Sequence, residues 1–216
     1  MAVIDDRMSI FINSFDSALP DYLEEIKRKA LEDNVPIVRD DMQTLLKFLM
    51  KERKPVDILE VGCAVGFSGL LMMEYAPENA HLTTIENYEV RIPIALSNFE
   101  SAGEDKAERI ELIEGDAADV LFGLEGEYDF IFLDAAKAQY INYLPDIMRL
   151  LKKGGMLVTD NVLQEGDILE SRYAITRRDR TIHSRMREYL YEIKHREDLE
   201  TVILPVGDGA TLSVKL

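Results

Sequence analysis

The chain has 216 residues and a formal net charge of −16, from 25 Lys and Arg against 41 Asp and Glu. Its length suits one domain of roughly 200 residues, and a composition of 47% hydrophobic and 31% charged residues excludes a disordered chain. No apolar run reaches about 18 residues, which argues against a membrane-spanning helix, and the acidic start lacks the basic region of a secretory signal. The single cysteine, Cys63, cannot form an internal disulfide, so we expect a cytoplasmic location.

The first 54 residues predict a helical N-terminal extension. Two amphipathic stretches between residues 7 and 34, separated by Pro20, carry apolar residues at helical spacing. Residues 35–38 (VPIV) form an extended link. Residues 40–54 open with acids and close with bases, a polarity that matches the dipole of a helix.

From residue 55 onwards, short apolar runs alternate with helical periodicity. Five runs of consecutive apolar residues (VDILEV, HLTTIE, RIELIEG, YDFIFLD and GGMLVTDN) indicate parallel strands covered on both faces. A loop at 161–176 and a charged helix at 177–196 follow, and two final β runs joined by Asp208-Gly209 predict an antiparallel hairpin. We therefore expect one domain, residues 1–216, in which residues 55–216 form an α/β core with a seven-stranded, mostly parallel sheet.

A glycine-rich turn, EVGCAVGFS at residues 60–68, follows the first strand and opens a helix. Gly62 and Gly66 allow a ligand to approach the backbone and the helix N–H groups at the carboxyl edge of the sheet. The dinucleotide fingerprint GxGxxG is missing, and the carboxylate of Glu60 disfavours a pyrophosphate and suits a cation. S-adenosylmethionine carries an ammonium and a sulfonium and fits this charge. Alternatively, the glycines only permit tight packing and Glu60 is a cap or is solvated.

Carboxylates at the ends of later strands extend this crevice. The two oxygens of Glu86, which ends the second strand, can accept both hydroxyls of a ribose. Asp116 and Ala117 follow the third strand, where an adenine edge is expected.

Two aspartates and an asparagine follow the fourth and fifth strands. Because parallel neighbours bring their carboxyl ends together, we expect Asp134, Asp160 and Asn161 to converge. Three oxygen donors suit a hard divalent cation such as Mg²⁺. The alternative role of these residues is helix capping and turn formation. The histidines are scattered and are expected at the surface instead of in a zinc site: His81, His183 and His195.

The motifs ILEVGCAVGFS, TTIE, EGDA, FLDAAKAQY and VTDNVL occur in this order within residues 35–215. Together they resemble the cation-dependent S-adenosylmethionine O-methyltransferases, the family that includes the catechol and caffeoyl-CoA enzymes. The resemblance implies a Rossmann-like class I methyltransferase fold, S-adenosylmethionine as methyl donor, and Mg²⁺ or Mn²⁺ as cofactor. It implies Asp134, Asp160 and Asn161 as metal ligands, with Lys137 as general base and Asp134 as a second catalytic residue. The residues implied around S-adenosylmethionine are Val38, Glu60, Gly62, Gly66, Ser68, Glu86, Asp116, Ala117 and Asp134.

The positions that hold the substrate depart from the catechol enzymes. Those enzymes have an aromatic residue in the glycine turn and a His-Trp pair after the first metal aspartate, whereas this chain has Ala64, Ala135 and Ala136 there and no Trp. The plant enzymes usually have a second acid at the position of Ala136. We therefore expect a pocket too open to hold a small phenol by stacking.

A closer resemblance is to the bacterial tRNA 5-hydroxyuridine methyltransferases, which form 5-methoxyuridine at the wobble position. The resemblance rests on VPIV, ILEVGCAVGFSG, IFLDAAKAQY, VTDNVLQEG, the arginines near residue 177 and LPVGDGATLS. It implies tRNA as the substrate and partner. The adjacent 5-hydroxyl and 4-carbonyl oxygens of the pyrimidine can chelate a metal as catechol oxygens do.

The distribution of charge bears on a tRNA substrate. An average of −16 argues against a polyanion, but residues 171–196 hold eight bases and three acids, a local charge of +5, which leaves −21 for the rest. Arg177, Arg178 and Arg180 are candidate phosphate contacts, and Tyr140 or Tyr173 is a candidate for stacking on a loop base. Alternatively, this helix is a salt-bridged surface or a dimer contact, and Tyr140 is a packing residue.

Two other classes of function are less consistent with these residues. A non-enzymatic RNA-binding protein would need neither the metal triplet nor Lys137, and a nicotinamide oxidoreductase is disfavoured by the missing GxGxxG. Within the enzyme class, the alternative substrate is a small catechol or a hydroxycinnamoyl ester. An apolar stripe at residues 8–19 indicates a homodimer, and related enzymes are commonly homodimers. Alternatively, this stripe packs on its own domain.

Overall fold

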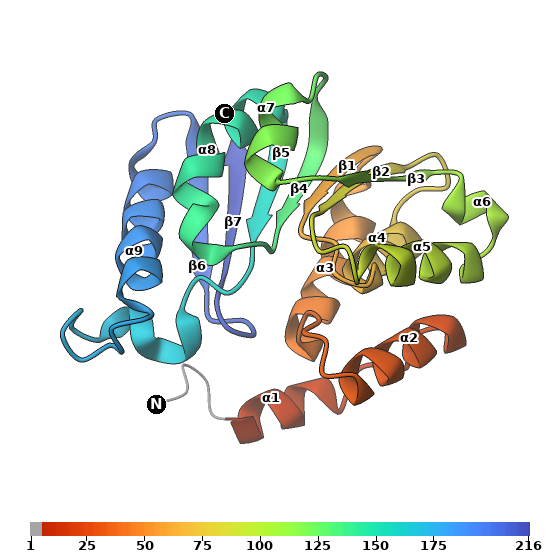
Figure 1. Ribbon diagram of the computed structural model, residues 1–216, viewed down its shortest axis with the longest axis horizontal. Helices are drawn as coiled ribbons and strands as arrows, with labels where there is room; N and C mark the ends of the chain where they lie inside the picture. Colours follow the sequence, from red (N-terminus) through yellow and green to blue (C-terminus); the bar gives the residue numbers. More distant parts are fainter. Residues whose placement is uncertain (1–5) are drawn as a thin grey trace.

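The computed structural model describes residues 6–216, so the first five residues of the expected domain lie outside the described residues. A seven-stranded sheet runs through the molecule with helices on both faces (Figure 1). The strands are β1 (Asp57–Val61), β2 (His81–Glu86), β3 (Ile110–Glu114), β4 (Tyr128–Leu133), β5 (Leu151–Thr159), β6 (Leu199–Leu204) and β7 (Ala210–Lys215). The helices are α1 (Asp6–Asn13), α2 (Asp21–Glu32), α3 (Asp40–Arg53), α4 (Phe67–Tyr75), α5 (Ile92–Ser101), α6 (Glu104–Ala107), α7 (Ala117–Gly123), α8 (Tyr140–Leu150) and α9 (Arg180–His195), with 3₁₀ turns η1 (Lys137–Gln139) and η2 (Gln164–Leu169).

The strand order is β3-β2-β1-β4-β5-β7-β6. Strands β1 to β5 pair in parallel, and β7 pairs antiparallel with both β5 and β6. The predicted mostly parallel sheet with a closing antiparallel hairpin is confirmed. The order reverses between β1 and β4, and the carboxyl ends beside such a reversal are where open α/β sheets bind ligands.

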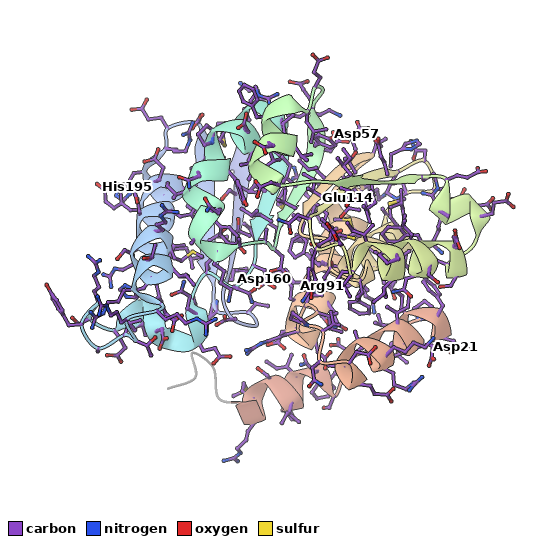
Figure 2. All side chains as sticks on the ribbon, viewed as in Figure 1. Asp21, Asp57, Arg91, Glu114, Asp160 and His195 are labelled. Carbon is purple, nitrogen blue, oxygen red and sulfur yellow. The ribbon has the colours of Figure 1, made fainter. Side chains whose placement is uncertain are left out.

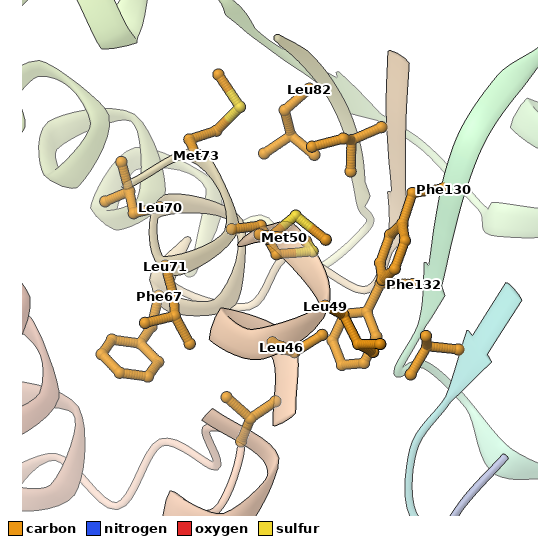
Figure 3. Packing of buried hydrophobic residues seen from close by; sticks show 14 of the residues in the cluster. Leu46, Leu49, Met50, Phe67, Leu70, Leu71, Met73, Leu82, Phe130 and Phe132 are labelled. Carbon is orange, nitrogen blue, oxygen red and sulfur yellow. The ribbon is translucent and has the colours of Figure 1, made fainter. Parts of the chain in front are cut away.

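Alternating side chains of the central strands build a core on each face of the sheet. Phe130 and Phe132 of β4 point to the face covered by α2 to α5, where they pack with Met50 and Leu46 (Figure 3). The intervening Ile131 belongs to the opposite core, which α7, α8 and α9 cover. This two-residue period explains why consecutive apolar residues mark a strand buried on both faces.

Several boundaries differ from the expected ones. Helix α1 ends at Asn13, and the segment predicted as a loop at 161–176 contains η2. Helix α9 begins only at Arg180, so two of the candidate arginines precede it. The hairpin connection spans residues 205–209, longer than the predicted two-residue turn. Among residues 6–216, no helix is long and apolar enough to cross a membrane.

The surface position predicted for His183 is wrong. Its side chain is buried, and its Nε2 lies 3.2 Å from the carbonyl oxygen of Glu170. The residue lies in the first turns of α9, on the face that packs against η2, so its burial depends on a tertiary contact that local periodicity does not define. His81 and His195 are exposed, as predicted.

Candidate active site

A cavity of about 540 Å³ opens at the carboxyl ends of the central strands. Its wall combines the glycine turn after β1, the end of β2, the segments after β4 and β5, and the link before α3. Asp160 and Arg91, both labelled in Figure 2, line it from opposite halves of the sheet. The volume lies within the usual range for sites that bind small ligands.

Gly62 allows the turn after β1 to approach the end of β4. Its φ is +105°, and a Cβ atom at this residue would lie 2.0 Å from the carbonyl oxygen of Asp134. Gly66, with φ +81°, precedes α4, and a Cβ there would lie 2.4 Å from the ring of Phe99. Both glycines therefore satisfy packing demands, but only Gly62 also lines the cavity.

Glu86 is held rigidly at the end of β2. One carboxylate oxygen accepts a hydrogen bond of 2.7 Å from the backbone N–H of Ala64, and the other accepts from the N–H groups of Asn87 and Tyr88. The side chain is buried and lines the cavity. A carboxylate fixed in this way has a defined direction in which to accept the hydroxyls of a ribose.

Glu60 lies behind the cavity wall. Its side chain is fully buried, and its two oxygens accept hydrogen bonds of 2.6 Å from Ser68 Oγ and Thr84 Oγ1. Burial raises the pKa of Glu60 to about 7, with smaller contributions from nearby acids, while the two hydroxyls oppose the shift. Ser68 lines the cavity and Glu60 does not, so Glu60 supports the wall through Ser68.

Six of the nine residues predicted around S-adenosylmethionine line the cavity. They are Val38, Gly62, Ser68, Glu86, Ala117 and Asp134. The structure does not place Glu60, Gly66 or Asp116 on the wall. The carboxylate of Asp116 instead caps α7, accepting a hydrogen bond of 2.9 Å from the N–H of Ala118.

The sheet brings Asp134, Asp160 and Asn161 together at the cavity, as predicted for the ends of β4 and β5. The N–H of Asp160 donates to the carbonyl of Leu133 over 3.0 Å, which continues the pairing of the two strands beyond their ends. Burial raises the pKa of both aspartates, and repulsion from Asp134 raises that of Asp160 further, whereas Lys137 lowers both. Two carboxylates forced together in this way are stabilised by added positive charge.

This donor set fits a hard divalent cation by its chemistry. Asp134 and Asp160 supply carboxylate oxygens, and the third position has the amide of Asn161, whose φ of +58° is tolerated by asparagine. Within residues 6–216, no three His, Cys, Asp or Glu side chains form a group that could hold a metal ion. Any metal bound at this cavity would therefore depend on the amide oxygen in addition to the two carboxylates.

Lys137 begins η1, three residues after Asp134, and lines the same cavity. Its side chain is about one-third exposed, and its Nζ lies 3.5 Å from a carboxylate oxygen of Asp208. The amine is therefore accessible from the cavity and is paired with Asp208, and its charge also acts on Asp134 and Asp160.

Four charged residues of the cavity wall were not predicted from the sequence: Arg39, Arg91, Glu165 and Asp208. Arg39 and Glu165 form a salt bridge of 2.8 Å that joins the N-terminal extension to η2 across the cavity. Asp208 was assigned only to a turn. Glu165 and Asp208 lie in the motifs VTDNVLQEG and LPVGDGATLS, which offered a signal, but neither residue was given a role at the site. Arg39 and Arg91 lie in no such motif.

The prediction that Tyr140 stacks on a base is wrong. Its ring is fully buried, packs edge-on against Tyr189 with 5.7 Å between centroids, and its hydroxyl lies 3.4 Å from the carbonyl oxygens of Ala135 and Asp160. The alternative, a packing residue, is correct, because α8 turns this face into the core. Tyr173, in contrast, is 86% exposed.

The candidate arginines do not line the cavity. Arg180 folds back onto its own segment, where its guanidinium donates to the carbonyl oxygens of Ile175 and Tyr173. Arg177 and Arg178 are exposed.

Comparisons with known proteins agree on the class of protein. A family model described as O-methyltransferase matches residues 13–216. Caffeoyl-CoA O-methyltransferase 5 of Nicotiana tabacum is 32% identical over 209 residues, covering 89% of this chain and 83% of the relative. Tapetum-specific methyltransferase 1 of Arabidopsis thaliana is 28% identical, covering 86% and 79%. The SAH-bound methyltransferase PaMTH1 of Podospora anserina superposes with a TM-score of 0.86 at 28% identity, covering 98% of this chain and 94% of that chain.

Proposed function

Since this chain belongs to the O-methyltransferase family and is an S-adenosylmethionine-dependent O-methyltransferase, we propose that it requires a divalent cation and that it methylates 5-hydroxyuridine at the tRNA wobble position to 5-methoxyuridine. One observation carries this proposal: Asp134, Asp160, Asn161 and Lys137 converge on one cavity, next to the residues suited to the methyl donor.

S-adenosylmethionine supplies an electrophilic methyl group on a sulfonium. Glu86 would accept hydrogen bonds from its ribose, Asp134 would lie near its methionine portion, and Ser68 would line the same cavity. The close approach permitted by Gly62 keeps the cofactor end of the cavity next to Asp134. Positioning of the two reactants is then the main contribution of this wall.

We propose that Asp134, Asp160 and Asn161 hold Mg²⁺ or Mn²⁺, which when bound lowers the pKa of the acceptor hydroxyl and fixes its orientation. Two observations support this assignment: both aspartates are buried, and their carboxylates repel each other. A bound cation would offset the cost of burying these charges and would screen their repulsion.

Lys137 would act as the general base. As the neutral amine, its Nζ would take the proton of the acceptor hydroxyl while the acceptor oxygen forms a bond to the methyl carbon. The carbon–sulfur bond of S-adenosylmethionine would break in the same step, so that the products are S-adenosylhomocysteine and the methyl ether. The proton then passes from Lys137 to solvent, to which its side chain is partly exposed.

The acceptor end of the cavity favours a base presented by a larger molecule. Ala64, Ala135 and Ala136 line it, so no side chain at these positions can stack on a small phenol. The specific observation in favour of the alternative, a small catechol or hydroxycinnamoyl ester, is that curated relatives are named caffeoyl-CoA O-methyltransferases.

Fewer basic side chains are available to bind RNA than the count of eight bases in residues 171–196 suggests. Five of the eight bases in 171–196 bond within the fold: Arg180, Arg185, Arg187 and Lys194 donate to backbone carbonyls, and Arg196 pairs with Asp198. Arg172, Arg177 and Arg178 are exposed and have no such partner within residues 6–216. With the exposed ring of Tyr173 they form the arginine surface, our proposed contact with the anticodon loop.

Homodimer formation is also proposed. Five apolar side chains of α1 and the following turn are more than half exposed, with exposed fractions between 52% and 74%: Met8, Ile10, Phe11, Ile12 and Phe15. Sedimentation of the chain as a monomer at micromolar concentration would contradict the dimer. A cytoplasmic location follows from the proposed tRNA substrate and stays a prediction.

The identity of the methyl acceptor is tested by comparing four candidate substrates. The purified chain is incubated with S-adenosylmethionine, Mg²⁺ and, separately, tRNA containing 5-hydroxyuridine, the same tRNA with unmodified uridine, caffeoyl-CoA and a simple catechol. We expect methyl transfer to the hydroxyuridine tRNA at the highest kcat/KM. Efficient turnover of caffeoyl-CoA or catechol with no transfer to hydroxyuridine tRNA would replace the tRNA proposal by its alternative.

A further inference from the structure

Asp208 is an almost fully buried carboxylate on the wall of the active-site cavity. It comes from the 205–209 connection between β6 and β7, far from the other polar groups in sequence. One of its oxygens lies 3.5 Å from Lys137 Nζ, and the other accepts a hydrogen bond from the backbone N–H of Glu165. The side chain therefore contacts the proposed base on one side and η2 on the other.

The connection that carries Asp208 is fixed on both flanks. The N–H of Leu163 donates to the carbonyl of Asp208, and the N–H of Val162 donates to that of Gly209, each over 2.9 Å. On the other flank, Asp41 at the start of α3 accepts a hydrogen bond of 3.2 Å from the N–H of Gly207. The carboxylate of Asp208 thus has little freedom to move relative to the end of β5.

The 205–209 connection also packs too closely for a larger residue. Gly209 has φ +85°, and a Cβ atom there would lie 2.2 Å from Cγ of Leu163. Gly207 and Gly209, on either side of Asp208, are thus held in place by contacts of their own backbone. The position of this backbone does not depend on the Asp208 side chain.

The negative charge of Asp208 has two free-energy costs, its own burial and its repulsion of a second carboxylate. A buried carboxylate costs free energy unless it is paired, and Asp208 also repels the nearby Asp160. Its hydrogen bond to Glu165 needs an oxygen but no charge. Lys137 is the cationic side chain paired with Asp208, so it gains from a negative charge at this position.

We infer that Asp208 is a positioning residue, which orients the amine of Lys137 in the cavity and stabilises the ammonium formed when that amine takes the proton of the acceptor. The inference rests on the proposed role of Lys137 as base. The arrangement follows the general pattern in which a base is itself oriented by a third, buried group.

The test is a double-mutant cycle on Asp208→Asn and Lys137→Met, assayed with whichever of hydroxyuridine tRNA or caffeoyl-CoA the unmodified chain methylates. Asn is isosteric and still accepts from the N–H of Glu165, so it removes the charge and keeps the anchor. The matched control is Asp198→Asn, which removes another Lys- or Arg-paired carboxylate from the opposite end of the same hairpin.

Asp208→Asn is expected to lower kcat by roughly 10- to 100-fold with little change in KM or in calorimetric affinity for S-adenosylmethionine. Asp208→Glu should recover part of the loss, and Asp198→Asn should leave kcat unchanged. The double variant should be no slower than Lys137→Met alone, because Asp208 acts only through Lys137. A crystal structure of Asp208→Asn should show the Lys137 amine displaced or in several rotamers.

The results that would overturn the positioning role of Asp208 also show whether Lys137 is the base. If Lys137→Met is inactive but Asp208→Asn retains full kcat, or if the two losses multiply, the positioning role is overturned and the base stands. If Lys137→Met retains full kcat, the proposed base is wrong and the positioning role is overturned with it. If Asp208→Asn loses affinity for S-adenosylmethionine or melts at a much lower temperature, its role is structural and the inference is again overturned.

Discussion

The α-carbon of Gly62 lies against the carbonyl oxygen of Asp134, so close that a Cβ at residue 62 would be 2.0 Å from that oxygen. This contact joins the turn after β1 to the end of β4, and it places the proposed cofactor and metal sites side by side. The spacing between the two parts of the cavity therefore depends on a residue without a side chain.

Replacement of Gly62 by alanine is expected to lower the free energy of unfolding by about 2–4 kcal/mol, because a methyl group must displace backbone. The same displacement moves Asp134, so methyl transfer should fall with stability. Thermal melting and kcat measure the two effects. Gly103→Ala is the matched control, since Gly103 has φ +104° but a methyl group added there would have nothing within 4 Å.

The control should lose about 1–3 kcal/mol, the cost of this glycine-type backbone conformation in alanine, and should keep full kcat because no neighbour is displaced. Equal losses in the two variants would contradict the claim that contact with Asp134, and not backbone conformation, makes Gly62 necessary.

Glu60 predicts a pH dependence of stability. Its pKa is raised from 4.5 to about 7 by burial, so the folded state binds a proton that the unfolded state releases above pH 4.5. The stabilisation from this group is complete below about pH 4.5 and is lost as the pH rises through about 7. Glu60→Gln lacks the titration, so its stability relative to the unmodified chain should improve by about 2–3 kcal/mol between pH 5 and pH 8.

Urea unfolding at the two pH values measures this difference. Because other titrating groups are common to both proteins, they cancel in the comparison. Parallel pH profiles for the two proteins would show that Glu60 is ionised throughout the range.

Asp134→Ala is expected to reduce methyl transfer by at least about 100-fold, because it removes a proposed metal ligand and a wall of the methionine site. The fold should persist, since removal of one of two buried like charges relieves repulsion with Asp160. Asp146→Ala, which removes a carboxylate of α8 outside the cavity, should keep full activity.

Chelation tests the metal independently of mutation. Treatment with EDTA should abolish activity of the unmodified chain, and added Mg²⁺ or Mn²⁺ should restore it. Full activity in EDTA-treated buffer would rule out the metal assignment.

The arginine surface predicts a salt dependence. Reversal of both Arg177 and Arg178 to Glu should raise the KM for tRNA and reduce the slope of log affinity against log salt by about 1 for each lost phosphate contact. Lys153→Glu, an exposed base at the start of β5, should change neither quantity. Unchanged methylation of tRNA by the double variant would end the proposal that this surface docks RNA.

The parts of the site that the sequence predicted share one physical basis. Consecutive apolar residues identify parallel strands, and parallel strands align their carboxyl ends, so Glu86, Asp134 and Asp160 could be placed on one edge from the order of residues alone. The same rule placed the glycine turn beside them.

The parts that escaped prediction depend on tertiary contacts. Asp208 reaches Lys137 across 71 residues of chain, and nothing local to either residue encodes the pairing. Periodicity assigned Tyr140 to a helix but not to the core, and a count of charges could not show that Arg180 and Arg185 are used by backbone carbonyls. Local sequence patterns predict helices, strands and the residues at the ends of the strands. The burial of a side chain and its hydrogen-bond partners depend on the tertiary fold.

Nucleoside mass spectrometry of cellular tRNA tests whether this protein forms 5-methoxyuridine. In a strain that lacks this protein, 5-methoxyuridine should disappear and 5-hydroxyuridine should accumulate in its place. Re-expression of the unmodified chain should restore 5-methoxyuridine, and the Asp134→Ala variant should not. Unchanged 5-methoxyuridine in the strain lacking the protein, together with no transfer to hydroxyuridine tRNA by the purified chain, would rule out 5-hydroxyuridine in tRNA as its substrate.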